Sequence, residues 1–159
     1  AISTFAAMCG HKLRKQESCA AVVTIFILTN PFKHQNRVNY KGVQNIRLDT
    51  PSNDSLQIIS VAMEGLRNIY RRDCIYKKAG IIVSGLVPQS QVQLSFFDNI
   101  EDIEKRHRIM QAVDTINNNY GRLTMRLAIN GFVHKWKLRQ KYLSPANTTL
   151  IDQLLRVKT

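Results

Sequence analysis

The stretch Ala20-Ala21-Val22-Val23-Thr24-Ile25-Phe26-Ile27-Leu28 decides the fold of this chain. It is rich in β-branched and apolar residues at both odd and even positions, a pattern typical of a central strand in a sheet. Thr29-Asn30-Pro31 follows, and proline cannot donate to a strand ladder. The sequence therefore predicts a central strand that ends near residue 29.

Helical and strand patterns flank this run on both sides. Apolar residues recur at helical spacing before it, which predicts that the chain begins within an amphipathic helix; they are Ile2, Phe5, Ala6, Cys9 and Leu13. Downstream, Asn45–Leu48 alternates as a half-exposed strand that points Arg47 away from the core. A start within a helix and without methionine led us to expect a piece of a longer protein.

A second helix and a third strand complete the first half of the chain. Thr50–Asp54 supplies capping residues for a long helix. The predicted buried stripe of this helix is Ile58, Ile59, Ala62, Met63, Leu66, Ile69 and Tyr70. A strand pattern runs from Ile75 to Leu86. The order helix, strand, strand, helix, strand predicts an α+β fold with helices on one face of an antiparallel sheet, leaving the other face open.

The charge of the chain indicates a polyanionic partner. There are 23 Lys and Arg against 11 Asp and Glu, a net charge of +12, and nucleic acid is the first candidate for such an excess. The acidic residues Asp98, Glu101, Asp102 and Glu104 form a short island. We interpret the island as the N-terminus of a helix, where carboxylates interact favourably with the helix dipole.

The sequence contains no pattern typical of catalysis, a metal site or a membrane. Three cysteines without a Cys-x-x-Cys pair favour a reducing compartment, the cytoplasm. Cys9, His11 and Cys19 lack zinc spacing. No run approaches the roughly 20 apolar residues of a membrane span. The acidic residues of the first half lie at predicted element ends, where capping suffices, so we expect no catalytic residue, metal or cofactor in this piece; they include Asp49, Asp54 and Asp73.

The segment Gln93-Leu94-Ser95-Phe96-Phe97 stands between the two halves of the chain. Its large apolar side chains would each gain roughly 1.5–3 kcal/mol from burial. They either fold back onto a domain or fill the pocket of a partner. Both alternatives are open on these residues alone.

A smaller basic module is predicted after this segment. Helical spacing of apolar residues predicts a helix closed by Gly121; these residues are Ile109, Val113, Ile116 and Tyr120. Arg122–Ile129 is predicted as a short strand that turns back at Asn130-Gly131. Trp136 is either the core anchor of this module or, with its cationic neighbours, a stacking residue for a base; the neighbours are Lys135, Lys137, Arg139 and Lys141.

Several short segments, in order, resemble one known family. They are Asn30-Pro31-Phe32, Tyr76-Lys77-Lys78-Ala79-Gly80-Ile81, Gln93-Leu94-Ser95-Phe96-Phe97-Asp98, Asn119-Tyr120-Gly121-Arg122, Leu143-Ser144-Pro145 with Thr148-Thr149, and Leu154-Leu155-Arg156-Val157-Lys158. On them the chain resembles the C-terminal region of the UmuC-type Y-family translesion DNA polymerases. The resemblance covers nearly the whole length.

The resemblance implies three parts. Residues 1–86 would be the little finger, a four-stranded sheet with two helices whose first strand would precede Ala1. Residues 87–99 would be a linker carrying a sliding-clamp peptide, and residues 100–159 a C-terminal accessory module of one helix and a short strand.

The resemblance also implies a function. The chain would be a non-catalytic fragment of an error-prone polymerase of DNA repair and the SOS response, in the bacterial cytoplasm at the nucleoid and without membrane contact. The full-length protein would be a nucleotidyltransferase that uses Mg²⁺. Primed or damaged duplex DNA, the sliding clamp, UmuD-type subunits and RecA are the partners that it implies.

The resemblance assigns two sets of site residues. Lys77 and Lys78 lie where the family carries a basic pair against the template backbone, and strand alternation lets only one of them point squarely at DNA. Further phosphate contacts are expected from Arg37, Lys41 and Arg47. The clamp contacts would be Gln93, Leu94, Phe96 and Phe97, with Phe96 where the family has leucine. The alternative is a standalone interaction module that competes for the clamp or for polymerase partners.

Overall fold

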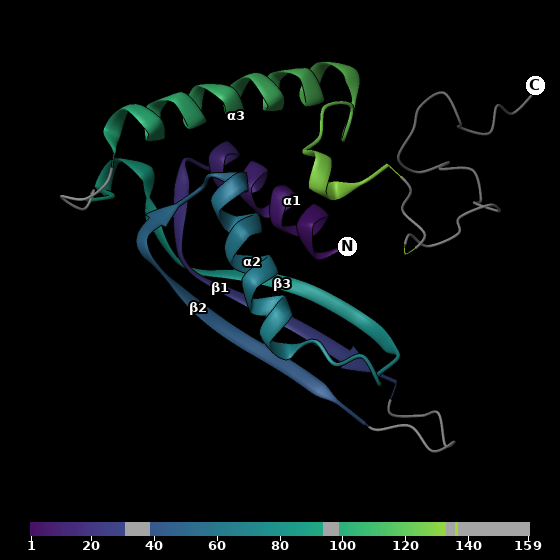
Figure 1. The fold of residues 1–159 in the computed structure, drawn as a ribbon. Coiled ribbons are helices and arrows are strands. Elements are labelled where there is room, and N and C mark those ends of the chain that lie inside the picture. Colours follow the sequence, from purple (N-terminus) through teal and green to yellow (C-terminus); the bar gives the residue numbers. More distant parts are fainter. Residues whose placement is uncertain (31–38, 94–98, 133–135, 137–159) are drawn as a thin grey trace, which may run out of the picture.

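A computed structural model describes residues 1–30, 39–93, 99–132 and 136 (Figure 1). The helices are α1 (Ile2–Lys15), α2 (Ser55–Ile69) and α3 (Ile100–Tyr120), and the strands are β1 (Ser18–Thr29), β2 (Lys41–Ser52) and β3 (Tyr76–Pro88). Two short 3-10 helices follow β3 and α3, η1 (Gln89–Gln91) and η2 (Ala128–Asn130). The element order of the first half matches the prediction, and the fold class is α+β.

Strand β1 is the centre of an antiparallel sheet with the order β2-β1-β3. The apolar run predicted this central position. A central strand pairs with a neighbouring strand on both sides, so it needs none of the charged side chains that protect an exposed sheet edge. The described residues supply no fourth strand, so within them β2 and β3 each pair on one side only.

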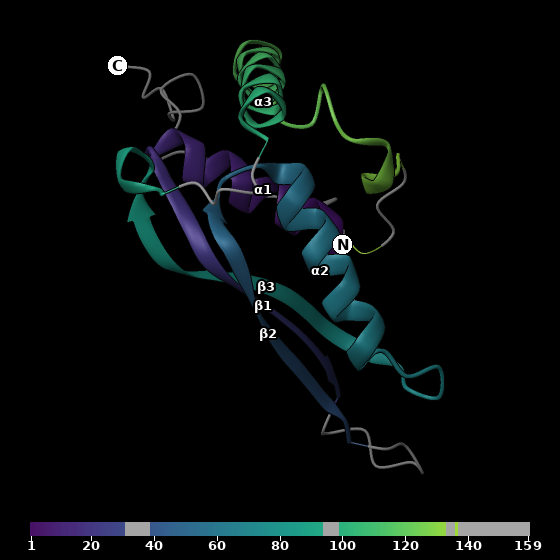
Figure 2. The same cartoon turned by 60° about the vertical axis from the view of Figure 1, so that its left-hand side comes forward.

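Helices α1 and α2 cover one face of the sheet, as Figure 2 shows. Alternate β1 residues Val23, Ile25 and Ile27 are buried beneath them. Helix α2 approaches β1 closely at Gly65, where a Cβ atom would lie 2.7 Å from Ile25 Cδ1. The core therefore lies between this helix layer and one face of the sheet, and no helix of the described residues covers the other face.

The capping chemistry of α2 and α3 follows the sequence. The Asp54 side chain accepts a hydrogen bond from the Leu56 N–H, and Asn99 caps α3 by accepting from Glu101 and Asp102. Gly121 ends α3 with φ of 102°, a left-handed value that favours glycine. Glu101 and Asp102 lie in the first turn of α3, as expected of an acidic helix start.

Some details of the helices and strands differ from the prediction. Helix α2 ends at Ile69, so Tyr70 is the C-cap residue and is exposed, not part of the buried stripe. Strand β3 continues to Pro88, because its last residues pair with Ser18–Ala20 of β1. On α3, Ile109 and Tyr120 are exposed, and Met110 is the residue that is buried.

The strand predicted over Arg122–Ile129 is wrong. This segment forms turns and η2, with Leu123 at φ of 67°. The Asn117 side chain accepts a hydrogen bond from the Met125 N–H and donates one to the Met125 carbonyl, each at 2.9 Å. The Asn117 side chain thus occupies the N–H and the carbonyl of Met125, the two backbone groups with which a neighbouring strand would pair.

Candidate nucleic-acid interface

The open face of the sheet is built from the alternate residues of β1 that the helices do not cover. Because directly paired residues of an antiparallel sheet point to the same face, the pairing register defines its rows. Val22, Thr24, Phe26 and Leu28 form the middle of the rows, and each pairs with one residue of β2 and one of β3.

Three predicted phosphate contacts share this face. Leu28 pairs with Lys41 on β2 and with Lys78 on β3, so these two lysines end one row. Arg47 pairs with Val22, which lies six residues before Leu28 in β1. At the rise of a strand the two rows are roughly 20 Å apart. All three cationic side chains are exposed. The geometry brings them together on one face; the phosphate role itself stays a prediction.

The other two predicted contacts lie elsewhere. The register of β1 and β3 shifts between Leu28 and Thr29, whose partners are Lys78 and Tyr76, so Lys77 is the residue without a ladder partner at this bulge. Arg37 lies outside the described residues. Lys78 is therefore the member of the pair that the register aligns with the open face.

The middle of the open face is apolar, which sequence reasoning missed. Val43 and Ile82 are 46% and 53% exposed. A Cβ atom added to Gly80 would lie 2.3 Å from Phe26 Cζ, so the Phe26 ring lies against the Gly80 backbone. A signal for this apolar patch was present in the strands. Phe26 pairs with Val43 on one side and with Gly80 on the other, and Ile82 lies two residues beyond Gly80.

A polar cluster fixes α3 to the helix layer. Arg14 of α1, only 7% exposed, donates from Nε to Asp114 Oδ2 at 2.6 Å and from Nη2 to Asp114 Oδ1 at 2.9 Å. His11 Nδ1 lies 2.9 Å from the same carboxylate. Arg14 Nη1 also donates to the Asn53 carbonyl and to Ser55 Oγ. One guanidinium thus joins α1, α3 and the start of α2.

This cluster shifts the acidity of Asp114. Burial by itself raises the pKa of the carboxyl, but the hydrogen bonds and charges of Arg14 and His11 outweigh it, and the net pKa lies below the ordinary value of 3.8. Asp114 is therefore ionised at neutral pH and accepts the Arg14 fork in a charge-assisted bond.

Both flanks of the predicted clamp peptide are attached to the folded body. Before the peptide, Asn53 Nδ2 donates to Gln89 Oε1 at 3.0 Å, and the Gln89 N–H donates to the Glu17 carbonyl. After it, α3 is held through Asp114 and Met110. Gln93 is exposed, whereas Leu94, Phe96 and Phe97 lie outside the described residues. A cavity of about 700 Å³ lies between these flanks, lined among others by Arg14, Asp54 and Met110.

Trp136 contacts the first half of the chain. Its ring meets Phe5 of α1 edge-to-face, with centroids 5.0 Å apart, and it is 41% exposed. The Ser3 hydroxyl donates to the Ile129 carbonyl beside it. The cationic neighbours that belong to the stacking alternative for Trp136 lie outside the described residues.

The described residues contain neither a group of three metal-ligating side chains nor a membrane-spanning helix. No three His, Cys, Asp or Glu side chains there lie close enough to hold an ion. The Mg²⁺ implied for a full-length polymerase thus has no ligand set among these residues. Within the same ranges, no helix is long and apolar enough to cross a membrane.

Fold and face together define a class of protein module. It is an antiparallel sheet with helices on one face and exposed lysine and arginine on the other, continued by a third helix, α3. Modules of this class can present cations to a polyanion across an open sheet.

Comparison with known proteins narrows this class to a family. Residues 1–96 match the impB/mucB/samB family C-terminal domain, and residues 107–157 match a domain described as of unknown function. The chain is 32% identical to the protein UmuC of Salmonella typhimurium over 158 residues, which cover 99% of this chain and 37% of that protein. It is 29% identical to SamB of Salmonella typhimurium and 30% identical to MucB of Escherichia coli, over 94% of this chain and 35% and 34% of theirs.

The chain belongs to the impB/mucB/samB family and represents the C-terminal region of a UmuC-type Y-family polymerase. It spans little more than a third of the length of the relatives that it matches.

Proposed function

We propose that this chain is the part of an error-prone translesion DNA polymerase that holds duplex DNA and docks to the sliding clamp, in bacterial DNA repair and the SOS response. The family supports the polymerase, and the open face supports the DNA contact. The observation that carries the proposal is the alignment of Lys41, Arg47 and Lys78 on one helix-free face of the sheet.

The chemistry of this face suits binding without sequence preference. Lysine and arginine neutralise phosphates, which position a duplex but carry no sequence information. The apolar residues between the cations offer no hydrogen bonds to base edges. A polymerase that travels along any template needs contacts that do not depend on the base sequence.

Salt titration of duplex binding tests this proposal. The apparent affinity of the chain for a labelled blunt duplex should fall with salt, with a slope in log–log form of about 0.9 for each neutralised phosphate. Lys41→Ala, Arg47→Ala and Lys78→Ala should each reduce the slope by about that amount. The matched control is Lys12→Ala, an exposed lysine of α1 on the helix layer. A slope of zero for the unaltered chain, or equal effects of the control, would contradict the proposal.

Clamp docking is proposed for Gln93, Leu94, Phe96 and Phe97. The similarity to the family's clamp motif supports it, as do the exposure of Gln93 and the attachment of both flanks. Leucine and two phenylalanines are apolar anchors of the kind that fill interface pockets. A peptide of this size should bind at about 1 μM, or about −8 kcal/mol, and tethering converts such affinity into a high effective concentration.

The test is a triple substitution, Leu94→Ala with Phe96→Ala and Phe97→Ala. It should abolish binding to purified bacterial sliding clamp, measured by calorimetry, and leave duplex binding unchanged. Equal loss of both activities would mean that the segment is structural. Phe96→Leu, which restores the family's usual residue, should retain clamp binding and serves as the conservative control.

The remaining partners are proposed on the resemblance. The module after residue 100 would contact UmuD-type subunits or the RecA filament, and the complete protein would polymerise DNA with Mg²⁺ held elsewhere than in the described residues, in the bacterial cytoplasm.

One observation favours the second candidate, an interaction module that docks to protein. Exposed Val43 and Ile82 make the middle of the open face apolar, which suits a protein surface better than phosphates. Val43→Ser with Ile82→Ser separates the two functions: it should leave the salt slope of duplex binding unchanged if the face holds DNA through its cations. Loss of a polymerase partner with intact DNA binding would favour the second candidate.

A further inference from the structure

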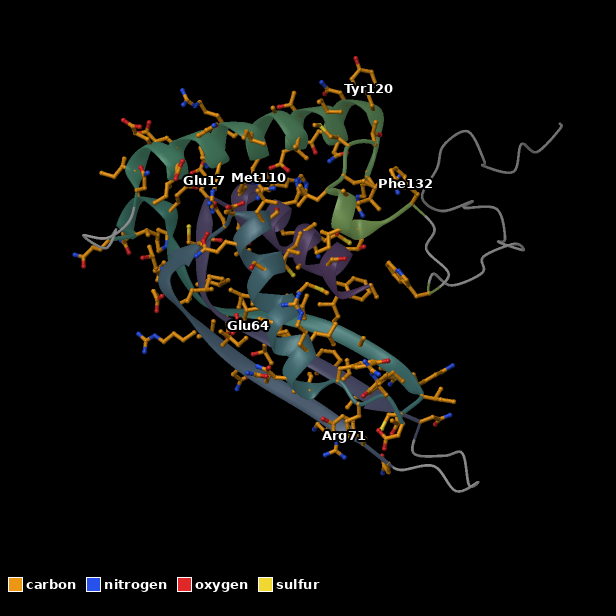
Figure 3. The ribbon with its side chains drawn as sticks, in the orientation of Figure 1. Glu17, Glu64, Arg71, Met110, Tyr120 and Phe132 are labelled. Carbon is orange, nitrogen blue, oxygen red and sulfur yellow. The ribbon has the colours of Figure 1, made fainter. Side chains whose placement is uncertain are left out.

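A cluster of three tyrosines lies where β2 and β3 begin their pairing with the end of β1. The rings of Tyr40 and Tyr76 meet edge-to-face with centroids 6.4 Å apart, and the ring of Tyr70 lies 5.5 Å from that of Tyr76 at an interplanar angle of 36°. The guanidinium of Arg71 lies 4.3 Å from the Tyr40 ring centre. Figure 3 shows Arg71 at the end of the sheet remote from α3.

Backbone hydrogen bonds hold two of these rings in place. The Tyr40 hydroxyl donates to the Ile69 carbonyl at 2.8 Å. The Tyr76 hydroxyl accepts from the Arg71 N–H at 2.7 Å and donates to the Arg71 carbonyl. Because both rings are already fixed in the free protein, little side-chain conformational entropy is lost when a ligand binds.

Tyr70 is the exposed end of this cluster. One side of its ring is turned toward Tyr76, and the residue remains 54% exposed although it lies directly beside the core residue Ile69. An exposed aromatic on a fixed aromatic support is the geometry on which nucleic-acid bases stack.

The charge around the cluster matches the same ligand. Residues 67–78 contain five cationic side chains, Arg67, Arg71, Arg72, Lys77 and Lys78, and one carboxylate, Asp73. Arg71 and Arg72 follow Tyr70 directly in the chain and are exposed, and the Arg71 guanidinium lies over the Tyr40 ring. Phosphates next to a base on Tyr70 would thus lie near cationic side chains.

We infer that Tyr70, supported by Tyr76 and Tyr40, is a stacking site for an unpaired base of single-stranded DNA, and that the neighbouring arginine side chains bind its phosphates. The inference rests on the proposed function, since it assumes that the chain holds DNA. It adds to it a second mode of contact, with unpaired rather than duplex DNA, at a different end of the sheet from Arg47.

Fluorescence anisotropy with the whole chain tests the inference, with a labelled oligothymidine and a labelled blunt duplex as probes. Tyr70→Ala should weaken oligothymidine binding about tenfold, the equivalent of one lost base stack. Tyr70→Phe should retain it, because the ring and not the hydroxyl makes the stack. Duplex binding should change by less than about twofold in both variants.

Two controls separate stacking from charge and from folding. Tyr120→Ala removes a tyrosine that is 77% exposed on α3, and should change neither probe. Arg72→Ala, at an exposed position two residues after Tyr70, should lower the salt slope for oligothymidine by about 0.7, whereas Tyr70→Ala should leave that slope unchanged. Thermal melts should coincide for the unaltered chain and Tyr70→Ala, because the side chain is exposed.

Several outcomes would overturn the inference. They are unchanged oligothymidine binding in Tyr70→Ala, an equal loss on the duplex, or the same weakening in Tyr70→Phe. A chain that binds duplex but not oligothymidine would refute the stacking site and leave the proposed function intact. A chain that binds neither probe would refute both.

Discussion

Helices α2 and α3 are attached to the rest of the molecule in different ways. Helix α2 buries Ile58, Ile59 and Ala62 against the sheet, whereas α3, although it has 21 residues, buries one side chain, Met110. What fixes α3 instead is the Arg14 fork on Asp114. Apolar burial is non-directional and spread over many residues, while an ion pair depends on two side chains and on their charge.

This difference matters because α3 follows the predicted clamp peptide. The flank before the peptide is held at Gln89 and the flank after it at Asp114. The second flank is therefore attached mainly by polar side chains, by Asp114 and by an Arg106–Asp54 ion pair at 3.7 Å, and the sheet should be indifferent to the loss of Asp114. The following experiments test this contrast.

The largest effect should come from the apolar core. Ile25→Ala, at a fully buried position of β1, should lower the free energy of unfolding by about 3 kcal/mol, because it removes apolar contacts and leaves a cavity. Urea denaturation followed by circular dichroism measures it. The matched control is Ile82→Ala at an exposed position of β3, expected to cost less than about 0.5 kcal/mol. Equal losses would mean that both sheet faces are packed.

A smaller and local effect should follow from Asp114→Asn. The substitution removes the negative charge that Arg14 and His11 contact, and should weaken the packing of α3 on the rest of the fold by about 2 kcal/mol. Hydrogen exchange should accelerate over residues 100–120 and remain slow in β1. Glu104→Gln, at an exposed position of the same helix, is the control and should change neither. Faster exchange in β1 as well would show that the cluster belongs to the core.

The smallest effect is expected from acid. The pKa of Asp114 is lowered in the folded state, so its stabilisation is complete above the ordinary value of 3.8 and is lost as pH falls through the lower folded value. Amide NMR shifts of α3 should therefore show a transition below about pH 4. The Asp114→Asn variant should lack that transition. An identical transition in the variant would assign it to another carboxyl.

The first half of the fold could be predicted because its information is local. A continuous apolar and β-branched run in residues 20–28 indicated β1, and Asp54 before an apolar stripe indicated the start of α2. The placement of Lys41 and Lys78 on one face was predicted only in part. Strand alternation indicated that one lysine of the pair would face outward, but the bulge that selected Lys78 depends on pairing with β1.

Other features could not be predicted, since they depend on residues far apart in the chain. Nothing near Asp114 in the sequence indicates Arg14, which lies 100 positions earlier. The tyrosine cluster joins residues 40, 70 and 76 from separate elements. The strand expected over residues 122–129 failed for a similar reason, because the Asn117 side chain takes the backbone groups of Met125.

The sequence by itself thus determined the elements of the first half and their order, the family and the basic character of the chain. Periodicity, capping and charge are properties of neighbouring residues and can be found without knowing the fold. The tertiary structure alone decided which cations share the open face, which side chain of α3 is buried, and how that helix is held. Those outcomes depend on strand register and on single directional bonds, which form only once distant segments have met.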